Sequence, residues 1–496
     1  MADAKTSFQP KTIIQMVPEG GSLLDAIAEK GGLGQTPQER FQGKEWVKVL
    51  ADEVLKGQVK VDKNTEQMLA ERISGIDELI SAQLNEVMHA EEFQKLEASW
   101  RGLLYLVKNS ETSGELKIKV LNVSKKDLLG DLKGAQDYDQ SGIFKKVYED
   151  EFGTLGGSPI AALIGDYQIT RHPADIDLIE RMSNVAAAAH APFLTSADPS
   201  LLSMDSFTKL GQTPDLTSTF KLAAYDRWRT FRKSEDSRYV GLCLPHVLMR
   251  LPYGKDTDQV EEFNFEENVD GRDHGKYLWG NAAYALGARL TDAFAKHEWC
   301  AAIRGVEGGG LVEDLPTHTF STDEGDIAVK CPTEIAITDR REAELSRLGF
   351  IPLSYYKGTN SAAFMAVQSA NEPEVFFEAD ANASSRLSAK LQYTFAICRF
   401  AHFLKAMMRD KVGSFMSRGQ CEKFLNQWIS NYVLLDDDGT QDAKAKYPLR
   451  EAEITVEEDP SKPGVYKAVA RLRPHFQLDE LTVSLRLVAR LPKQRS

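Results

Sequence analysis

The chain has 496 residues, of which 42% are apolar and 27% are charged, an ordinary composition for a globular protein with its own core. Its 73 acidic and 60 basic side chains give a formal net charge of −13, which argues against a nucleic-acid-binding protein because such proteins usually present a basic face. No stretch approaches the ~20 apolar residues of a membrane helix, no secretory signal core is visible, and the five cysteines form no CxxC pair. We therefore expect a cytoplasmic protein with free thiols.

Residues 1–60 are rich in glycine and poor in large apolar residues, which predicts a flexible N-terminal arm. Within it, Ser22 begins one short helix on which Leu23, Leu24 and Ile27 form an apolar stripe. A helix shorter than ~12–15 residues is marginal alone in water, and an amphipathic turn with flexible flanks is typical of a linear recognition motif. Packing of this helix on its own domain is the alternative, and the residues favour neither.

Apolar residues then recur at helical spacing in two consecutive runs, which predicts two packed helices with these side chains in the core. The runs are Leu69, Ile73, Ile76, Ile80, Leu84 and Val87, followed by Phe93, Leu96, Trp100, Leu103 and Val107.

Strands alternate with helices through the rest of residues 61–375, which predicts a mixed sheet-and-helix core. The expected strands are 116–120, 159–164, 239–244, 300–303, 334–337 and 350–353. The expected helices are 125–132, capped by Ser124, and 175–189, 281–296 and 339–348.

Residues 376–496 begin with one long expected helix, 384–411, and a second around 424–433. Two strands, 453–457 and 465–472, flank a Pro- and Gly-containing turn and predict a hairpin. A last run alternates apolar and other residues with period two, which predicts a strand. Its apolar members are Leu481, Val483, Leu485, Leu487 and Ala489. The fold class we expect is mixed α/β, of the α+β type.

The search for catalytic or cofactor chemistry gives little. The glycine clusters, including Gly305–Gly310, lack the Lys-Ser/Thr of a phosphate loop and the GxGxxG spacing of a dinucleotide fold. The nine histidines show no metal-ligand spacing, so we expect no metal and no cofactor. A soluble enzyme remains the alternative, with a site around Asp166 and His172 or at the Gly305–Gly310 loop.

A small basic run, Arg227 to Lys233, carries Trp228 and Phe231 between its cations. Nucleic-acid binding is conceivable for such a run. Glu235 and Asp236 follow directly, however, which favours salt bridges or contact with an acidic protein surface.

Seven strings, in order and spacing, resemble the large subunit of the type VI secretion contractile sheath. They are 165–167 (GDY), 187–193 (AAAHAPF), 228–232 (WRTFR), 250–254 (RLPYG), 278–283 (LWGNAA), 299–310 (WCAAIRGVEGGG) and 399–405 (RFAHFLK). Each string alone is weak, whereas the ordered set is specific and spans nearly the whole chain. His246, after Pro245, departs from the basic residue that the family pattern has there.

The resemblance implies a structural protein that is not an enzyme. It implies pairing with a small sheath subunit and polymerisation with neighbouring sheath subunits on a baseplate, around a hexameric inner-tube protein. The sheath then contracts, and an AAA+ ATPase disassembles it. Neither nucleic-acid binding nor direct membrane insertion is implied.

The resemblance also implies roles for particular segments. The helix with Leu23, Leu24 and Ile27 resembles the motif that the ATPase recognises, and the strand 481–489 resembles one that interlaces neighbouring subunits. Residues 61–375 would include the region that binds the small subunit. The helix 339–348 resembles the charged attachment helix for the inner tube. The residues we expect in that contact are Arg229, Arg232, Asp339, Arg340 and Glu342.

Overall fold

A computed structural model describes residues 36–56, 65–213, 215–261, 263–321, 327–414, 416–436, 438–458, 466–475 and 477. The chain divides into two compact units. The first comprises Met1–Leu84 with Val260–Phe265, and the second comprises Asn85–Gln259 with Glu266–Ser496. The described residues combine many helices with a mixed sheet and smaller sheets, which confirms the expected α+β class.

The first unit contains helix α2 (Pro37–Leu55) and most of helix α3 (Thr65–Met88). A capping box begins α2, because Glu39 N donates to Thr36 Oγ1 over 3.3 Å and Thr36 N donates to Glu39 Oε2 over 3.1 Å. Pro37 occupies the first helical position, where its missing N–H is not needed. The prediction of a flexible arm missed α2, although this start signal was present in the sequence.

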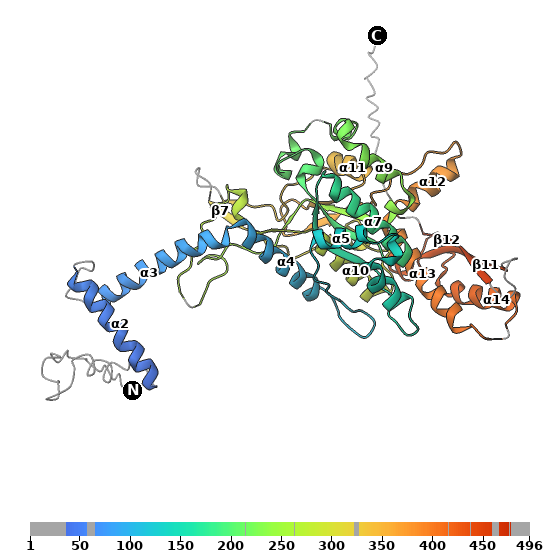
Figure 1. The fold of residues 1–496 in the computed structure, drawn as a ribbon. Helices are drawn as coiled ribbons and strands as arrows, with labels where there is room; N and C mark the ends of the chain where they lie inside the picture. The colour runs from blue at the N-terminus through green and yellow to red at the C-terminus, as the bar shows by residue number, and fades with distance from the viewer. Residues whose placement is uncertain are drawn as a thin grey trace, which may run out of the picture. The chain divides into compact units, whose positions relative to one another are not determined.

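A six-stranded sheet forms the core of the second unit (Figure 1), in the order β1-β2-β3-β9-β10-β6. The strands from β1 to β9 in this order run parallel, and β10 and β6 are antiparallel to their neighbours. Their bounds are β1 Leu163–Ile169, β2 Phe193–Ala197, β3 Val240–Leu244, β9 Ile351–Tyr355, β10 Ala362–Phe364 and β6 Leu311–Val312.

The expected strands at 239–244 and 350–353 are confirmed by β3 and β9. The strand expected at 159–164 overlaps β1 only at its end. The predictions of strands at 116–120, 300–303 and 334–337 are wrong, because these residues form no strand in the structure.

Side-chain alternation along β3 separates two layers of the core. Val240 and Leu242 belong to the buried cluster formed with α7 (Pro173–Ala189), whereas Cys243 belongs to the cluster formed with α10 (Ala283–His297). Successive side chains of a strand point to opposite faces. Helix α7 therefore covers one face of the sheet and α10 the other.

The other elements of the second unit are shorter or peripheral. The helices are α4 Glu91–Lys108, α5 Lys125–Gly134, α6 Gly142–Phe144, α8 Leu216–Thr219, α9 Asp226–Lys233, α11 Asp339–Arg347 and α15 Gln441–Lys446. The remaining strands are β4 Val247–Leu248, β5 Trp279–Gly280, β7 Thr319–Ser321 and β8 Ile327–Val329. The expected Ser124 cap of α5 is confirmed, since Ser124 Oγ accepts from Asp127 N at 3.1 Å.

The prediction of one long helix over 384–411 is wrong. The segment contains two helices, α12 (Ala379–Ser388) and α13 (Leu391–Asp410). Between them the chain leaves the helical path, because Ser369 N donates to Ala389 O over 2.8 Å. This hydrogen bond to a distant segment replaces helical hydrogen bonds. The spacing of apolar residues within 384–411 could not predict it.

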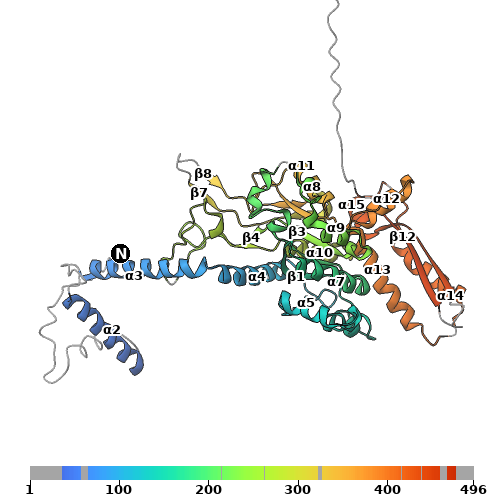
Figure 2. The same ribbon diagram turned by 45° about the horizontal axis from the view of Figure 1, so that its top comes forward.

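The expected hairpin is confirmed and is longer than the sequence suggested. Strands β11 (Leu449–Glu458) and β12 (Tyr466–Pro474) form a two-stranded antiparallel sheet that lies against α14 (Arg418–Ile429), as Figure 2 shows. Apolar side chains from α14 and β11, including Leu425 and Ile454, join a third buried cluster.

Candidate assembly surfaces

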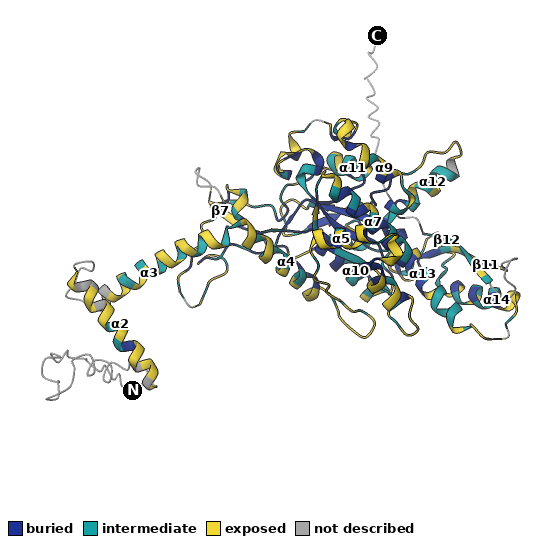
Figure 3. Ribbon diagram, viewed as in Figure 1, coloured by how far each residue is buried: buried dark blue, intermediate teal, exposed yellow. Residues whose placement is uncertain are grey.

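Helix α4 has both buried and exposed residues along its length (Figure 3), and several of the exposed ones are apolar. On its buried face, Gly102 lies so close to Tyr284 of α10 that an added Cβ would stand 2.4 Å from the ring. On its outer side, Trp100 is 65% exposed and Leu96 56% exposed. Phe93, Leu104 and Val107 are exposed as well. The prediction that the stripe lies in the core of this chain is therefore wrong for most of its members.

Helices α2 and α3 of the first unit also present apolar side chains to solvent. On α3, Leu69, Ile73, Ile76, Leu79 and Ile80 are exposed. On α2, Phe41, Trp46, Val49 and Leu55 are exposed. Single exposed apolar residues are normal, but rows of them on one helix mark surfaces that bind another protein.

The two edges of the β11–β12 sheet differ. The Asn426 side chain of α14 accepts from Ile454 N at 2.9 Å and donates to Ile454 O at 2.6 Å, and Val456 N donates to Glu422 Oε2 at 3.0 Å. Helix α14 thus closes the outer edge of β11. Ala470 pairs with Ile454, so its own N–H and C=O point away from β11. Among the described residues β12 has no second neighbour, which leaves its outer edge open.

Helix α11 holds three of the residues expected to contact an inner tube. Asp339 and Arg340, in its first turn, are exposed. Glu342 is half-buried, and its Oε1 accepts from Ser346 Oγ at 3.0 Å. Burial raises the pKa of the Glu342 carboxyl above its usual range. Asp339 and Arg340 are thus more available to a partner than Glu342.

The two arginines expected beside α11 are bound within the chain. Arg232 is only 7% exposed, and its guanidinium donates to Ala370 O and to Arg347 O, each over 3.0 Å. Arg232 thus fixes the end of α11 within this chain, and its contact with the inner tube stays a prediction. Arg229 Nη1 donates to Phe220 O over 2.6 Å, so it also has a structural contact, although it is half-buried.

The residues of the alternative enzyme site have structural roles. His172 is the N-cap of α7, where its Nδ1 accepts from Ala174 N at 3.2 Å. Asp166 is exposed on β1, and its Oδ1 accepts from Asn281 Nδ2 at 3.3 Å. Neither side chain lines the small cavity that adjoins α7.

The Gly305–Gly310 loop uses its backbone donors internally. Gly310 N donates to Gly305 O over 2.9 Å, and Gly305 N donates to Phe364 O of β10 over 2.8 Å. A Cβ on Gly309 would lie 2.2 Å from Ala302 O, so glycine serves close packing there. A cradle for phosphate needs free N–H groups, and these two are taken.

Within the described residues, no group of three or more His, Cys, Asp or Glu is arranged to hold a metal ion. None of the described helices is both long and apolar enough to cross a bilayer. The expected ATPase motif with Leu23, Leu24 and Ile27 and the expected interlacing strand 481–489 lie outside the described residues.

Comparison with known proteins gives matches to tail sheath proteins. The tail sheath N-terminal domain of the EvpB/VC_A0108 family matches residues 70–371, and the gpW/gp25-like domain of the same tail sheath matches residues 380–491. The chain therefore belongs to this family of tail sheath proteins. It is 48% identical over 454 residues to the type VI secretion system sheath protein TssC1 of Pseudomonas aeruginosa, a match that covers 90% of this chain and 91% of that protein. The resemblance to the sheath large subunit is thus confirmed.

Two solved structures are distantly similar. One is a chain of the anti-feeding prophage baseplate, at 8% identity and a TM-score of 0.34, covering 63% of this chain and 66% of that chain. The other is a chain of the contracted anti-feeding prophage sheath, at 8% identity and a TM-score of 0.29, covering 62% of this chain and 66% of that chain. The chain thus spans just under two thirds of the length of these two chains.

Proposed function

We propose that this chain is the structural large subunit of a contractile sheath that pairs with a small subunit, polymerises around an inner tube in the cytoplasm, and contracts to drive that tube outward. Family membership supports the sheath assignment. The observation that carries the polymerisation step is the outer edge of β12, which no other strand of the described chain covers, next to a β11 edge that α14 closes.

An open strand edge presents unpaired backbone groups that another strand can complete. The alternating run 481–489 of a neighbouring subunit fits that role, because backbone hydrogen bonds supply affinity and alternate side chains fix the register. The run 481–489 of one subunit and the β12 edge of the next are different surfaces. The contact is therefore heterologous and extends into an open filament. Closure of the β11 edge limits this addition to one side of the hairpin.

The small subunit covers the apolar row of α4 and, separately, the row of α3. Burying side chains such as Leu96 and Trp100 is worth roughly 1.5–3 kcal/mol each. The opposite face of α4 is held against α10 through Gly102 and Tyr284, which makes the row a rigid platform. The small subunit thus buries apolar side chains of α4 and α3 that are exposed in the chain alone.

The exposed pair Asp339 and Arg340 contacts the inner tube, while the N-terminal segment with Leu23, Leu24 and Ile27 is the ATPase-recognition motif. The baseplate starts the assembly. Contraction needs two packings of one lattice, with the extended packing higher in free energy. The energy is then stored in subunit contacts, so the chain needs no catalytic site.

The test is co-expression of the chain with its small partner, followed by negative-stain electron microscopy. Long tubes of regular width are the expected result. Dispersed particles over a range of salt concentrations, from a pair that co-purifies, would overturn the polymerisation proposal. A chain that does not co-purify with the small subunit would overturn the pairing proposal.

A further inference from the structure

A protruding loop before α12 exposes apolar side chains between carboxylates. We call residues 372–378 the docking loop. Val375 is 91% exposed, and Phe377 is fully exposed. Glu374 and Glu378 flank them and are exposed too, with no ion-pair partner in the described chain. An exposed aromatic side chain flanked by carboxylates is typical of a residue that anchors a contact with another protein.

Both ends of the docking loop are fixed. At its start, Asn371 Nδ2 donates to Arg232 O over 3.2 Å. At its end, Phe376 N donates to Asn382 Oδ1 over 2.6 Å, and Asn382 Nδ2 donates back to Phe376 O over 2.5 Å. This reciprocal pair sets the backbone next to Phe377. A loop that is already ordered loses less entropy when it binds.

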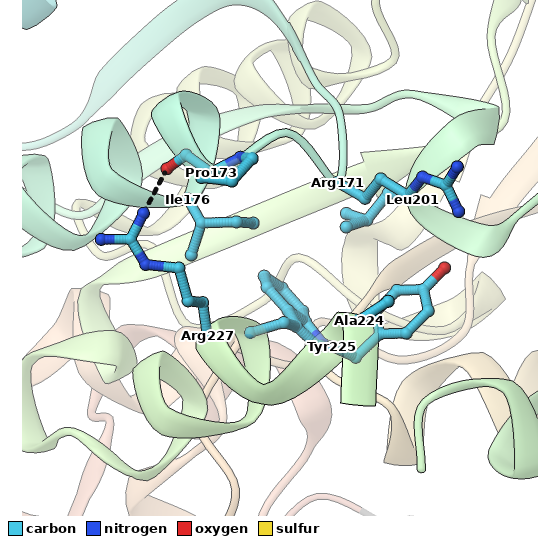
Figure 4. Close-up of a pocket in the computed structure, with 8 residues that line it drawn as sticks. Arg171, Pro173, Ile176, Leu201, Ala224, Tyr225 and Arg227 are labelled. Carbon is cyan, nitrogen blue, oxygen red and sulfur yellow. Dashed lines mark hydrogen bonds between the residues drawn. The ribbon is translucent and has the colours of Figure 1, made fainter. Parts of the chain in front are cut away.

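The same chain contains a surface of matching chemistry, which we call the arginine hollow (Figure 4). Arg171 and Arg227 lie on opposite sides of it, with Ile176 and Tyr225 between them. Arg227 Nη1 donates to Pro173 O over 3.3 Å. Within the described residues neither guanidinium forms an ion pair with a carboxylate. The hollow thus places two unneutralised cations around a small apolar surface, in which Pro173 and Ala224 are exposed and Ile176 and Tyr225 are buried.

We propose that the docking loop of one copy of this chain binds the arginine hollow of a second copy. Glu374 and Glu378 would pair with the two arginines, and the edge of Phe377 would lie on Pro173 and Ala224, beside a guanidinium. Arginine binds both carboxylates and aromatic faces, so both parts of the loop have a partner. The hollow itself holds about 30 Å³, close to the volume of one water molecule. The tip of the ring enters it, and the rest lies across the arginine stems.

Loop and hollow are different surfaces, so the contact is heterologous and repeats from copy to copy. It is a side-chain contact separate from strand addition at β12. The inference rests on the proposed polymerisation, because an assembly places two copies at high local concentration. In the lattice it orients neighbours, since opposite charges give specificity more than affinity.

The test uses two charge-reversed variants, each co-purified with the small subunit. The loop variant is Glu374→Arg with Glu378→Arg, and the hollow variant is Arg171→Glu with Arg227→Glu. Each variant alone brings like charges together, so we expect at least about a tenfold loss of assembled tubes. An equimolar mixture should assemble, because in an alternating order every loop meets a hollow of opposite charge. A chain with all four changes should assemble as well.

The control reverses two exposed carboxylates elsewhere, Glu149→Arg with Asp150→Arg, with the same change in net charge as the loop variant. It should assemble like the wild type. Normal tubes from either the loop or the hollow variant alone would overturn the proposal, as would a mixture that stays unassembled. Rescue by the four-change chain without rescue by the mixture would place the contact within one chain.

A second readout separates this proposal from polymerisation itself. Phe377→Cys in one copy and Ala224→Cys in another should cross-link into a dimer that denaturing electrophoresis detects. If wild-type pairs form no tubes yet these copies cross-link, polymerisation fails and the contact stands. If tubes form and no cross-linked dimer appears, the contact fails and polymerisation stands.

Discussion

His246 Nδ1 lies 2.6 Å from Glu334 Oε2, and both side chains are buried. The second carboxylate oxygen of Glu334 lies 3.3 Å from His274 Nε2 and accepts from Ser206 Oγ at 3.2 Å. One carboxylate therefore joins three segments that are distant in the sequence. Burial alone would raise the pKa of Glu334, but the hydrogen bonds and charges of the two histidines outweigh it and lower the pKa to about 2.

A depressed carboxyl pKa makes stability depend on pH in a known direction. From an ordinary value of 4.5 to about 2, ionised Glu334 contributes about 3 kcal/mol above pH 4.5, and this contribution is lost as pH falls from about 4.5 to about 2. Glu334→Gln should lower the free energy of unfolding at pH 7 and make that free energy fall less steeply between pH 4.5 and pH 2. Denaturant titrations of the co-purified pair at several pH values measure both, with Glu149→Gln as an exposed control. The same pH dependence below pH 4.5 in Glu334→Gln and in the wild type would contradict the lowered pKa of Glu334.

The exposed row of α4 predicts a loss of partner binding without a loss of folding. Leu96→Ala with Trp100→Ala should reduce co-purification of the small subunit at least about tenfold, because central aromatic anchors carry most of the energy of an interface. The thermal midpoint of the chain itself should change little, since neither side chain is in its core. Glu92→Ala, on the same helix, is the control. Full retention of the small subunit by the double variant would rule the row out.

Strand addition at β12 predicts a specific failure of assembly. Deleting 481–496 should abolish tubes while soluble heterodimers persist, because the deletion removes the strand that we propose is exchanged between subunits. Ala470→Pro removes one outward N–H of β12 and should shorten or abolish tubes as well. Electron microscopy and size-exclusion chromatography report the two states. Tubes of normal length from the deleted chain would exclude exchange of this strand.

The N-terminal motif predicts a change in disassembly and not in assembly. Leu24→Ala with Ile27→Ala removes two apolar anchors, so binding to the AAA+ ATPase should fall at least about tenfold. Tubes should form as in the wild type. A pull-down with the purified ATPase measures the affinity, and Glu29→Ala in the same arm serves as the control. Equal capture of the double variant and the wild type would reject the motif.

Two arginines near α11 should respond differently to substitution. Arg340→Glu changes an exposed charge, so we expect tubes with less inner-tube protein inside and an unchanged thermal midpoint. Arg232→Ala leaves Ala370 O and Arg347 O without their donor, which should cost about 1–3 kcal/mol of stability. Thermal unfolding and electrophoresis of purified tubes distinguish these outcomes. A full inner-tube content in Arg340→Glu would remove α11 from that contact.

Local chemistry made several elements predictable. The Ser124 cap, the helix 339–348 and the hairpin strands follow from capping, periodicity and turn residues that act over a few positions. The break between α12 and α13 was not predictable, because it depends on Ser369, 20 residues before Ala389. Arg232 looked like a surface cation for the same reason, as its acceptors lie far along the chain.

The order of the strings from Gly165 to Lys405 was enough to identify a sheath protein, because a family pattern consists of particular residues in a particular order. Apolar periodicity was also enough to find α3 and α4, but not to say what covers them. Helical spacing shows that a face is apolar, whereas burial depends on which surfaces the fold brings against it. In the folded chain, one face of α4 packs against α10, and Trp100 on another face stays exposed to solvent. Tertiary packing likewise closed β11 with Asn426, while β12 has no second strand beside it within the described ranges, because edge protection comes from a helix outside the hairpin.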